Sequence, residues 1–337
     1  MIKVAVIGAG FMGSMHAEIY KHFPDIKIAG IVDSRGEKAK SLAEKVGSIP
    51  FYDAEQVFAR EDITLIDVCL PTYLHKEFVL KAAEAGKDVI CEKPIALTLE
   101  DAEEMIEVCE KRRVRFMVGH VIRFWPEYDW LKSIADSGRI GKLLSITCTR
   151  LSPTPVWGWD SWLTDTSRSG NCLFDLHIHD TDYLLYLVGK KPLKLYSTGL
   201  KSNGGYSHIF TNFTFPDGVQ ASAEGGWDFP ANFPFYMAFT ATFEKAIVEF
   251  NSKNLPLTVY HREGKVEHPP MKNVPIQANA GGNISDLGGY YFELRYFFEH
   301  ILANKPTAVI TPNDARNSLE IILKEQESAD TGKEIIL

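Results

Sequence analysis

Three glycines near the N-terminus have the types and spacing of residues that hold a phosphate group. An apolar run at 2–7 leads into Gly8-x-Gly10-x-x-Gly13 and then into a helical pattern. A strand, a tight turn and a helix in this order present backbone N–H groups to a pyrophosphate. Gly8 permits the turn, Gly10 lets the phosphates approach, and Gly13 lets the helix pack on the strand. We therefore expect a dinucleotide loop that also includes Phe11 and Met12.

A second apolar run, at 26–32, ends in Asp33, where an acidic side chain would accept hydrogen bonds from an adenine ribose. The carboxylate would also repel a 2′-phosphate, which favours NAD over NADP. Ser34 and Arg35 follow directly. Because a guanidinium can stack on adenine or pair with a phosphate, use of NADP stays open.

A lysine follows another apolar run, in Glu92-Lys93-Pro94. Ligands of parallel sheets lie beyond the carboxyl ends of the strands, so Lys93 is expected beside the cofactor. A cation there can stabilise charge that exists only in the transition state. The alternative is a surface lysine after a strand, which Pro94 disfavours because it stiffens the backbone. Further cofactor contacts are expected after the strand at 64–70, from Leu70, Pro71, Thr72 and His75.

A second group of polar residues lies between Asp175 and Asp182. If the segment is helical, Asp175 and His179 are four residues apart and share one face, whereas His177 points to the other side. A carboxylate beside an imidazole suits proton transfer to or from an alcohol. Two alternatives remain open at this point: Asp175 as a helix cap, and a metal site formed by His177, His179 and the acidic residues. Helix geometry disfavours the metal, since the two histidines face apart.

Strands and helices alternate from the N-terminus to about residue 120, which predicts a doubly wound, parallel α/β sheet. The predicted strands are 2–7, 26–32, 64–70, 87–91 and 114–119, and the predicted helices 13–22, 35–46, 53–59, 74–85 and 99–112. After residue 120, runs of β-branched and aromatic residues predict an α+β domain with a large, mostly antiparallel, open-faced sheet. Its predicted strands are 142–150, 193–200, 207–215, 218–226, 235–243, 245–251, 256–260 and 334–337, and its predicted helices 126–137, 171–188, 286–303 and 313–330. We expect two domains, at 1–121 and 122–337. The last helix, at 313–330, could pack back on the first of these domains.

Composition excludes several classes of protein. The 337 residues carry a formal net charge of −8, which argues against general binding of nucleic acid or anionic membrane. An apolar content of 45% and no low-complexity segment argue against disorder. No leader or membrane-spanning run is evident, so a cytoplasmic protein is expected. The five cysteines lack metal-ligand spacing and are expected as reduced thiols.

Together these motifs resemble the glucose-fructose oxidoreductase, inositol dehydrogenase and rhizopine catabolism family (Gfo/Idh/MocA). Beyond the glycine loop, Asp33 and Glu92-Lys93-Pro94, the resemblance is carried by segments at 71–75, 85–89, 123–124, 138–141, 175–182 and 327–333. It implies a Rossmann domain followed by an α/β domain, NAD as the cofactor, and homodimers or homotetramers built through the open sheet. It also implies catalysis by Lys93, His179 and Asp175. One departure is His177, where many relatives carry a smaller residue.

The resemblance implies an oxidoreductase acting on CH–OH groups of a sugar, sugar derivative or inositol. His120, Arg123 and a cluster of three tryptophans and one aspartate are expected on the substrate side, and Arg123 and Glu92 are also expected near the cofactor. The members of the cluster are Trp157, Trp159, Asp160 and Trp162. Aromatic faces beside polar donors suit a sugar or cyclitol. Two alternatives stay open: NAD-dependent glycoside cleavage with internal redox cycling, and a regulator that binds the nucleotide without chemistry. The sequence names neither the substrate nor the direction of the reaction.

Overall fold

The computed structural model describes residues 1–274 and 287–337, which fold into two compact units. The first unit comprises Met1–Val121, Trp157–Trp162 and Val274–Leu319; the second comprises Ile122–Val156, Leu163–Asn273 and Glu320–Leu337. None of the described helices is long and apolar enough to cross a membrane.

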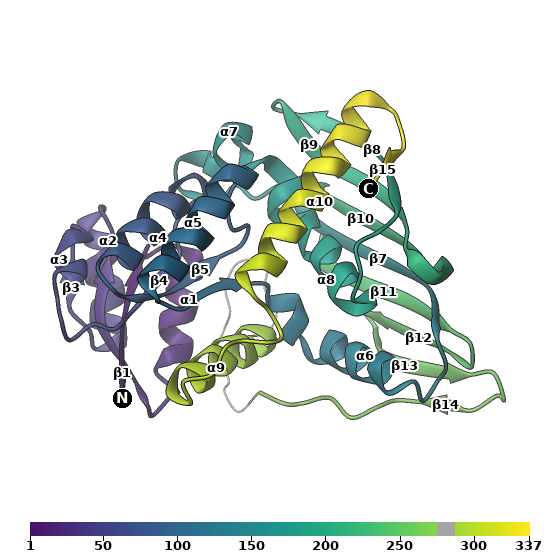
Figure 1. The fold of residues 1–337 in the computed structure, drawn as a ribbon, viewed down its shortest axis with the longest axis horizontal. Coiled ribbons are helices and arrows are strands. Elements are labelled where there is room, and N and C mark those ends of the chain that lie inside the picture. The colour runs from purple at the N-terminus through teal and green to yellow at the C-terminus, as the bar shows by residue number, and fades with distance from the viewer. Residues whose placement is uncertain (275–286) are drawn as a thin grey trace. The chain divides into compact units, whose positions relative to one another are not determined.

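The first unit contains a six-stranded sheet in which every pairing is parallel, in the order β3-β2-β1-β4-β5-β6 (Figure 1). Its strands are β1 (Ile2–Ile7), β2 (Ile26–Val32), β3 (Pro50–Phe51), β4 (Leu65–Val68), β5 (Asp88–Glu92) and β6 (Phe116–Gly119). Its helices are α1 (Phe11–Tyr20), α2 (Gly36–Val46), α3 (Glu55–Phe58), α4 (His75–Glu84), α5 (Leu99–Arg112) and α9 (Gly288–Leu302). This strand order is that of a doubly wound dinucleotide-binding sheet, which confirms the predicted fold class.

Aromatic packing explains why α9, far along the chain, belongs to the first unit. Phe298 packs edge-on against Tyr20, and Tyr291 against Phe23, with ring centroids 5.1 Å apart in both pairs. Such pairs contribute beyond the area that they bury. The helix had been predicted over 286–303; residue 286 lies outside the described residues, and the remainder is confirmed within one residue at its end.

The second unit contains a nine-stranded sheet in the order β14-β13-β12-β11-β7-β10-β9-β8-β15. Only β7 and β10 pair in parallel, so the sheet is mostly antiparallel, as predicted. Its strands are β7 (Leu143–Pro153), β8 (Lys194–Ser202), β9 (Gly205–Thr214), β10 (Gln220–Phe229), β11 (Tyr236–Phe243), β12 (Ala246–Asn251), β13 (Leu255–His261), β14 (Val266–Glu267) and β15 (Ile335–Ile336). Its helices include α6 (Pro126–Ser137), α7 (Thr166–Ser169) and α8 (Ile178–Val188).

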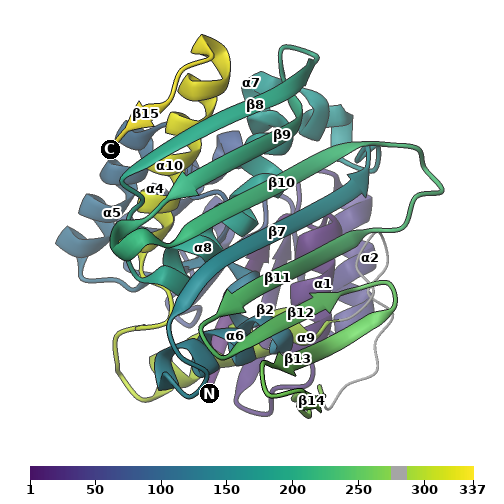
Figure 2. The same ribbon diagram turned by 90° about the vertical axis from the view of Figure 1, so that its right-hand side faces the viewer.

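The nine-stranded sheet has one helix-covered face and one open face, and Figure 2 shows the open face toward the viewer. Along β7 the side chains alternate: Ile146, Cys148 and Arg150 are buried, whereas their neighbours are more exposed. This alternation is the period-2 pattern of a strand with one covered face. The last helix, α10 (Pro312–Thr331), contributes residues to both units, divided after Leu319.

Candidate active site

The glycine-rich loop has the geometry that its spacing predicts. Gly8 has φ +104°, and a Cβ atom there would lie 2.4 Å from the carbonyl oxygen of Cys69. A Cβ atom on Gly13 would lie 1.8 Å from the carbonyl oxygen of Gly8, so any side chain would force the loop and α1 apart. Gly10 precedes α1 and has no atom within 4 Å of its Cβ position. The first turn of α1 carries no acidic side chain, which leaves its positive dipole end suited to an anion.

Asp33, at the end of β2, is held by two neighbours. Its carboxylate accepts hydrogen bonds of 2.9 Å from the Ala9 backbone N–H and of 2.8 and 2.9 Å from the Arg35 guanidinium. Burial alone raises the pKa of Asp33, but the bonds from Arg35 and Ala9 outweigh it and hold the pKa below its usual range. The carboxylate is therefore ionised near neutral pH, and Arg35 partly neutralises it.

The tryptophan-rich segment lies beside these residues rather than apart from them. The rings of Trp157 and Phe11 have centroids 5.2 Å apart, and the guanidinium carbon of Arg35 lies 5.5 Å from the centroid of the Trp159 ring. Both tryptophans are about half exposed, at 48% and 47%. The sequence had predicted these tryptophans for the substrate; the structure puts them next to residues predicted for the cofactor.

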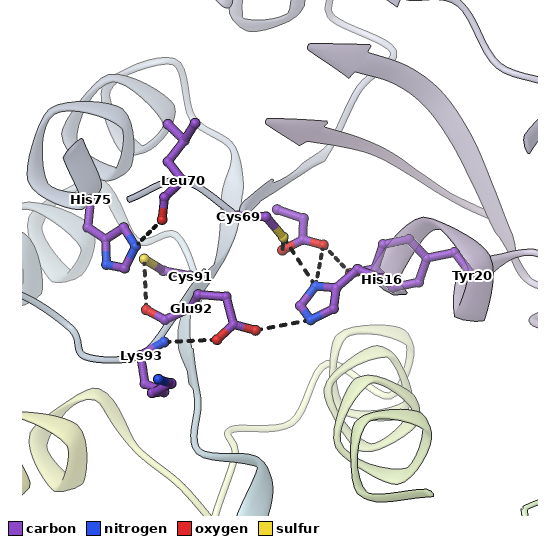
Figure 3. Close-up of polar contacts among 9 residues, drawn as sticks. His16, Tyr20, Cys69, Leu70, His75, Cys91, Glu92 and Lys93 are labelled. Carbon is purple, nitrogen blue, oxygen red and sulfur yellow. Dashed lines mark hydrogen bonds and ion pairs between the residues drawn. The ribbon is translucent and has the colours of Figure 1, made fainter. Parts of the chain in front are cut away.

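His75 links two segments that follow neighbouring strands. One ring nitrogen lies 2.9 Å from the carbonyl oxygen of Leu70 and the other 2.9 Å from that of Pro94 (Figure 3 draws the Leu70 contact). Burial lowers the pKa of His75, which favours the neutral ring. A neutral ring has one N–H, which can donate to one of these two carbonyl oxygens. The imidazole therefore lies between the segment after β4 and the Glu92-Lys93-Pro94 segment and hydrogen-bonds one of them.

Glu92 ends β5, and Lys93 follows it, joined to Pro94 by a cis peptide bond. The Glu92 carboxylate is buried; one oxygen accepts a 3.2 Å hydrogen bond from the Lys93 backbone N–H, and the other lies 3.1 Å from Nε2 of His16. Figure 3 shows these contacts continuing through His16. His120, predicted on the substrate side, follows β6 and is buried.

Sequence reasoning missed His16, which lies in α1 three residues after Gly13. The signal was a histidine on the buried side of a helix, flanked by the buried residues Met15 and Ala17. Among the described residues, His16, Asp67 and Cys69 form the one group of side chains whose ligand atoms could surround a metal ion. They also bond to one another: Nδ1 of His16 lies 2.9 Å from Asp67 Oδ2 and 3.4 Å from Cys69 Sγ.

In the second unit, the segment with Asp175 and His179 departs from the predicted α-helix. A regular α-helix had been expected over 171–188; the structure has a π-helical turn at Leu173–His177, followed by α8. A π turn widens the helix and changes which side chains align, and such turns are frequent at functional sites. Asp175 is partly buried and His179 is buried.

His177 belongs to a buried network around Glu325. Its Nε2 lies 2.7 Å from Oε2 of Glu325 on α10, which also accepts a 2.6 Å hydrogen bond from the Thr211 hydroxyl. The Thr181 hydroxyl bonds the other oxygen of Glu325 at 2.7 Å. A Cβ atom on Gly225 would lie 2.7 Å from the His177 ring, so β10 leaves room for it.

Two arginines bind the acidic residues of the same segment. Arg150 donates two hydrogen bonds to Asp180, of 2.8 and 2.9 Å, and Arg123 donates two to Asp182, of 2.7 and 2.8 Å. All four side chains are buried. Asp180, Asp182 and His177 thus each pair with a side chain outside the segment: Arg150, Arg123 and Glu325. Arg123, predicted to contact ligands, lies in this structural pair.

Comparison with known families matches both parts of the chain. Residues 2–120 match the model of an oxidoreductase family with an NAD-binding Rossmann fold, and residues 128–249 match the GFO/IDH/MocA C-terminal domain. A levoglucosan dehydrogenase structure in complex with NADH and levoglucosan superposes with a TM-score of 0.86 over 99% of both chains at 23% identity, which supports the fold.

Two curated relatives are similar over a shorter range. The 2,7-anhydro-N-acetylneuraminate hydratase of Mediterraneibacter gnavus is 33% identical over 67% of this chain and 61% of its own. The myo-inositol 2-dehydrogenase of Thermotoga maritima is 33% identical over 59% of this chain and 58% of its own. The chain thus spans about three fifths of the length of the curated relatives it matches.

Proposed function

Because the chain belongs to the Gfo/Idh/MocA oxidoreductase family, we propose that it transfers a hydride between NAD and a CH–OH group of a sugar, sugar derivative or inositol. One observation carries the proposal: Lys93 directly follows β5, an inner strand of the sheet whose glycine loop has no room for side chains at Gly8 and Gly13. Relatives named as inositol and glucoside dehydrogenases support the substrate class.

The cofactor is held, in this proposal, by the first unit, which includes Trp157–Trp162. The glycine loop binds the pyrophosphate, and Asp33 accepts hydrogen bonds from the adenine ribose. We assign Trp157 and Trp159 to the cofactor side, because they lie against Phe11 and Arg35. Ser34, Leu70, Pro71, Thr72 and His75 complete the proposed contacts, whereas His120 and Arg123 are kept as substrate-side proposals.

Three residues carry the proposed chemistry. NAD supplies the hydride acceptor when the substrate is oxidised. His179 takes the hydroxyl proton as the C–H bond breaks, and Lys93 stabilises the developing alkoxide. Asp175 fixes the orientation of His179 and supports its charged form. His179 must be neutral to accept the proton, so the rate of oxidation falls at acidic pH.

A second candidate is a reaction with no net oxidation, in which the nicotinamide is reduced and reoxidised within one turnover. The observation that favours it is the relative named as a hydratase, since adding water changes no overall oxidation state. Glycoside cleavage is another reaction of this kind. Both use the same proposed residues, so the products distinguish the candidates.

The decisive experiment is a screen of polyols, inositols and aldoses with NAD, followed by absorbance of the reduced cofactor. A dehydrogenase gives stoichiometric NADH; product without NADH supports the redox-neutral candidate.

Lys93→Ala and His179→Ala should each lower turnover by about two to four orders of magnitude and leave NAD affinity nearly unchanged. The exposed residues Lys111 and His22 offer matched controls, Lys111→Ala and His22→Ala. Full activity in Lys93→Ala would refute the assignment.

A further inference from the structure

A chain of buried polar side chains runs through the first unit beneath the glycine loop, and the proposed chemistry does not use it. We call it the His16 network; its members are His16, Tyr20, Asp67, Cys69 and Glu92. Each is less than 9% exposed. Buried polar and charged groups destabilise a fold unless they are paired, so each contact in such a network has a strong geometric preference.

The contacts fix which atoms carry protons. Asp67 faces three donors: the Tyr20 hydroxyl at 2.6 Å, His16 Nδ1 at 2.9 Å and the Cys69 thiol at 3.4 Å. Burial raises the pKa of Tyr20 and of Cys69, so both keep their protons and donate. In all three contacts the oxygens of Asp67 are the acceptors. His16 Nδ1 therefore carries a proton and donates it to Asp67.

The other nitrogen of His16 reaches the Glu92-Lys93-Pro94 segment. Nε2 lies 3.1 Å from Oε1 of Glu92. A carboxylate oxygen accepts and does not donate, so a proton on Nε2 suits this contact as one on Nδ1 suits the contact with Asp67. The imidazole thus joins α1, which begins at the glycine loop, to the end of β5.

Glu92 carries the connection to Lys93. Its second carboxylate oxygen accepts the Lys93 backbone N–H at 3.2 Å. Tyr20 reaches His16 only through Asp67, and Figure 3 shows the contacts that lead from His16 through Glu92 to the Lys93 backbone. Without His16, Oε1 of Glu92 would lose its ion-pair contact, and among the described residues only the hydrogen bond of Oε2 with the Lys93 backbone N–H would remain to hold the carboxylate.

We propose that His16 is a positioning residue, which holds the Glu92 carboxylate in the rotamer that fixes the backbone bearing Lys93. This inference rests on the proposed role of Lys93. A displacement of a reacting group by about 1 Å can lower a rate by about 100-fold, so a residue that never contacts substrate can affect turnover strongly.

Two substitutions separate the two contacts of the imidazole. In His16→Asn the amide nitrogen of the new side chain takes the place of Nδ1, so the variant keeps the hydrogen bond to Asp67 and loses the contact with Glu92. In His16→Gln the amide nitrogen takes the place of Nε2, so the variant keeps the contact with Glu92 and loses the hydrogen bond to Asp67. We expect kcat to fall about 10- to 100-fold in His16→Asn, with KM changed less, and to stay within about threefold in His16→Gln. Tyr20→Phe, which removes one donor to Asp67 without touching Glu92, is the control and should keep kcat within about twofold.

Hydrogen exchange gives a readout that needs no activity. Measured by mass spectrometry on the NAD-free protein, the peptide covering 88–96 should exchange faster in His16→Asn than in wild type, His16→Gln or Tyr20→Phe. Equal exchange and equal kcat in the Asn and Gln variants would overturn the positioning role. If His16 only stabilised the fold, the loss of kcat in each variant would follow its loss of unfolding free energy and not its contact with Glu92. If wild type shows no nicotinamide-linked turnover, the proposed function fails, and exchange at 88–96 still decides whether His16 holds this segment.

Discussion

At the scale of single residues, we predict that the Asp33–Arg35 pair determines the preference between NAD and NADP. The carboxylate disfavours a 2′-phosphate, whereas the guanidinium that it binds would attract one. We expect wild type to bind NAD more tightly than NADP. Asp33→Ala should narrow or reverse the preference by roughly 10- to 100-fold, because it removes the repulsion and releases Arg35. Fluorescence titration measures both affinities, and Arg35→Ala should shift the preference the opposite way. Tighter NADP binding by wild type would make Arg35 the dominant selector.

Paired carboxylates should also make the first unit sensitive to acid. Arg295 on α9 bonds Asp25 and lowers the pKa of that carboxyl, as Arg35 does for Asp33. A carboxyl whose pKa is lower in the folded than in the unfolded state stabilises the fold above the unfolded value of about 3.9. That stability is lost as the pH falls through the folded pKa. Urea unfolding between pH 7 and 3 should show that the free energy of unfolding decreases as the pH falls, and this decrease should be smaller in Arg295→Ala. If the free energy of unfolding depended on pH equally in Arg295→Ala and wild type, the Arg295–Asp25 pair would not contribute to acid sensitivity.

At the scale of elements, His177 ties the π-helical segment to α10 through Glu325. His177→Ala should lower the free energy of unfolding by about 1–3 kcal/mol, because Glu325 keeps only its hydroxyl partners. His177→Gln should recover part of the loss, since its amide can donate to Glu325. Equilibrium unfolding in urea measures both variants. Equal stability of His177→Ala and wild type would show that the pair contributes nothing. Because His177→Ala is expected to lower stability, it would not serve as a neutral control variant for His179→Ala.

The regular elements could be predicted from the sequence, because period-2 and period-3.6 patterns depend only on neighbouring residues. The glycine loop and Asp33 were accessible for the same reason. What escaped were pairings set by the tertiary fold. The partners His16 and Glu92, and likewise Arg123 and Asp182, lie far apart in the chain. The π turn was not predicted, because it keeps the apolar pattern of an α-helix. The two-residue strands β3 and β14 were not predicted, because two residues are too few to show a periodic pattern.

At the scale of the whole molecule, we propose that the open sheet face forms a homodimer or homotetramer interface. Tyr196 on β8 and Phe210 on β9 are 40% and 42% exposed, and Leu200 is exposed beside them. Elsewhere the face carries Ser and Thr side chains such as Thr147 and Thr240. Exposed aromatic patches on a flat sheet favour association with a second copy.

The double variant Tyr196→Asp/Phe210→Asp should shift the protein toward the monomer, because a carboxylate buried in an interface lacks a partner. Sedimentation velocity at micromolar concentration measures the shift. Tyr52→Asp, which replaces an aromatic residue that is 56% exposed in the first unit, is the control and should leave the assembly intact. A monomeric wild type would rule out the interface.

The contact of Trp157 with Phe11 gives the protein an optical signal of its own. Indole emission overlaps the absorption of reduced nicotinamide, so NADH bound at the glycine loop should quench this tryptophan and emit by energy transfer. The chain has six tryptophans, and Trp159 lies in the same segment as Trp157. The double variant Trp157→Phe/Trp159→Phe should therefore lower the transfer more than Trp157→Phe alone, and the other four tryptophans supply the remainder. Occupancy could then be followed in single turnovers, in stopped flow, without labels. In a reaction without net oxidation the same emission would appear as a transient that rises and decays within each cycle, visible even where bulk absorbance stays flat.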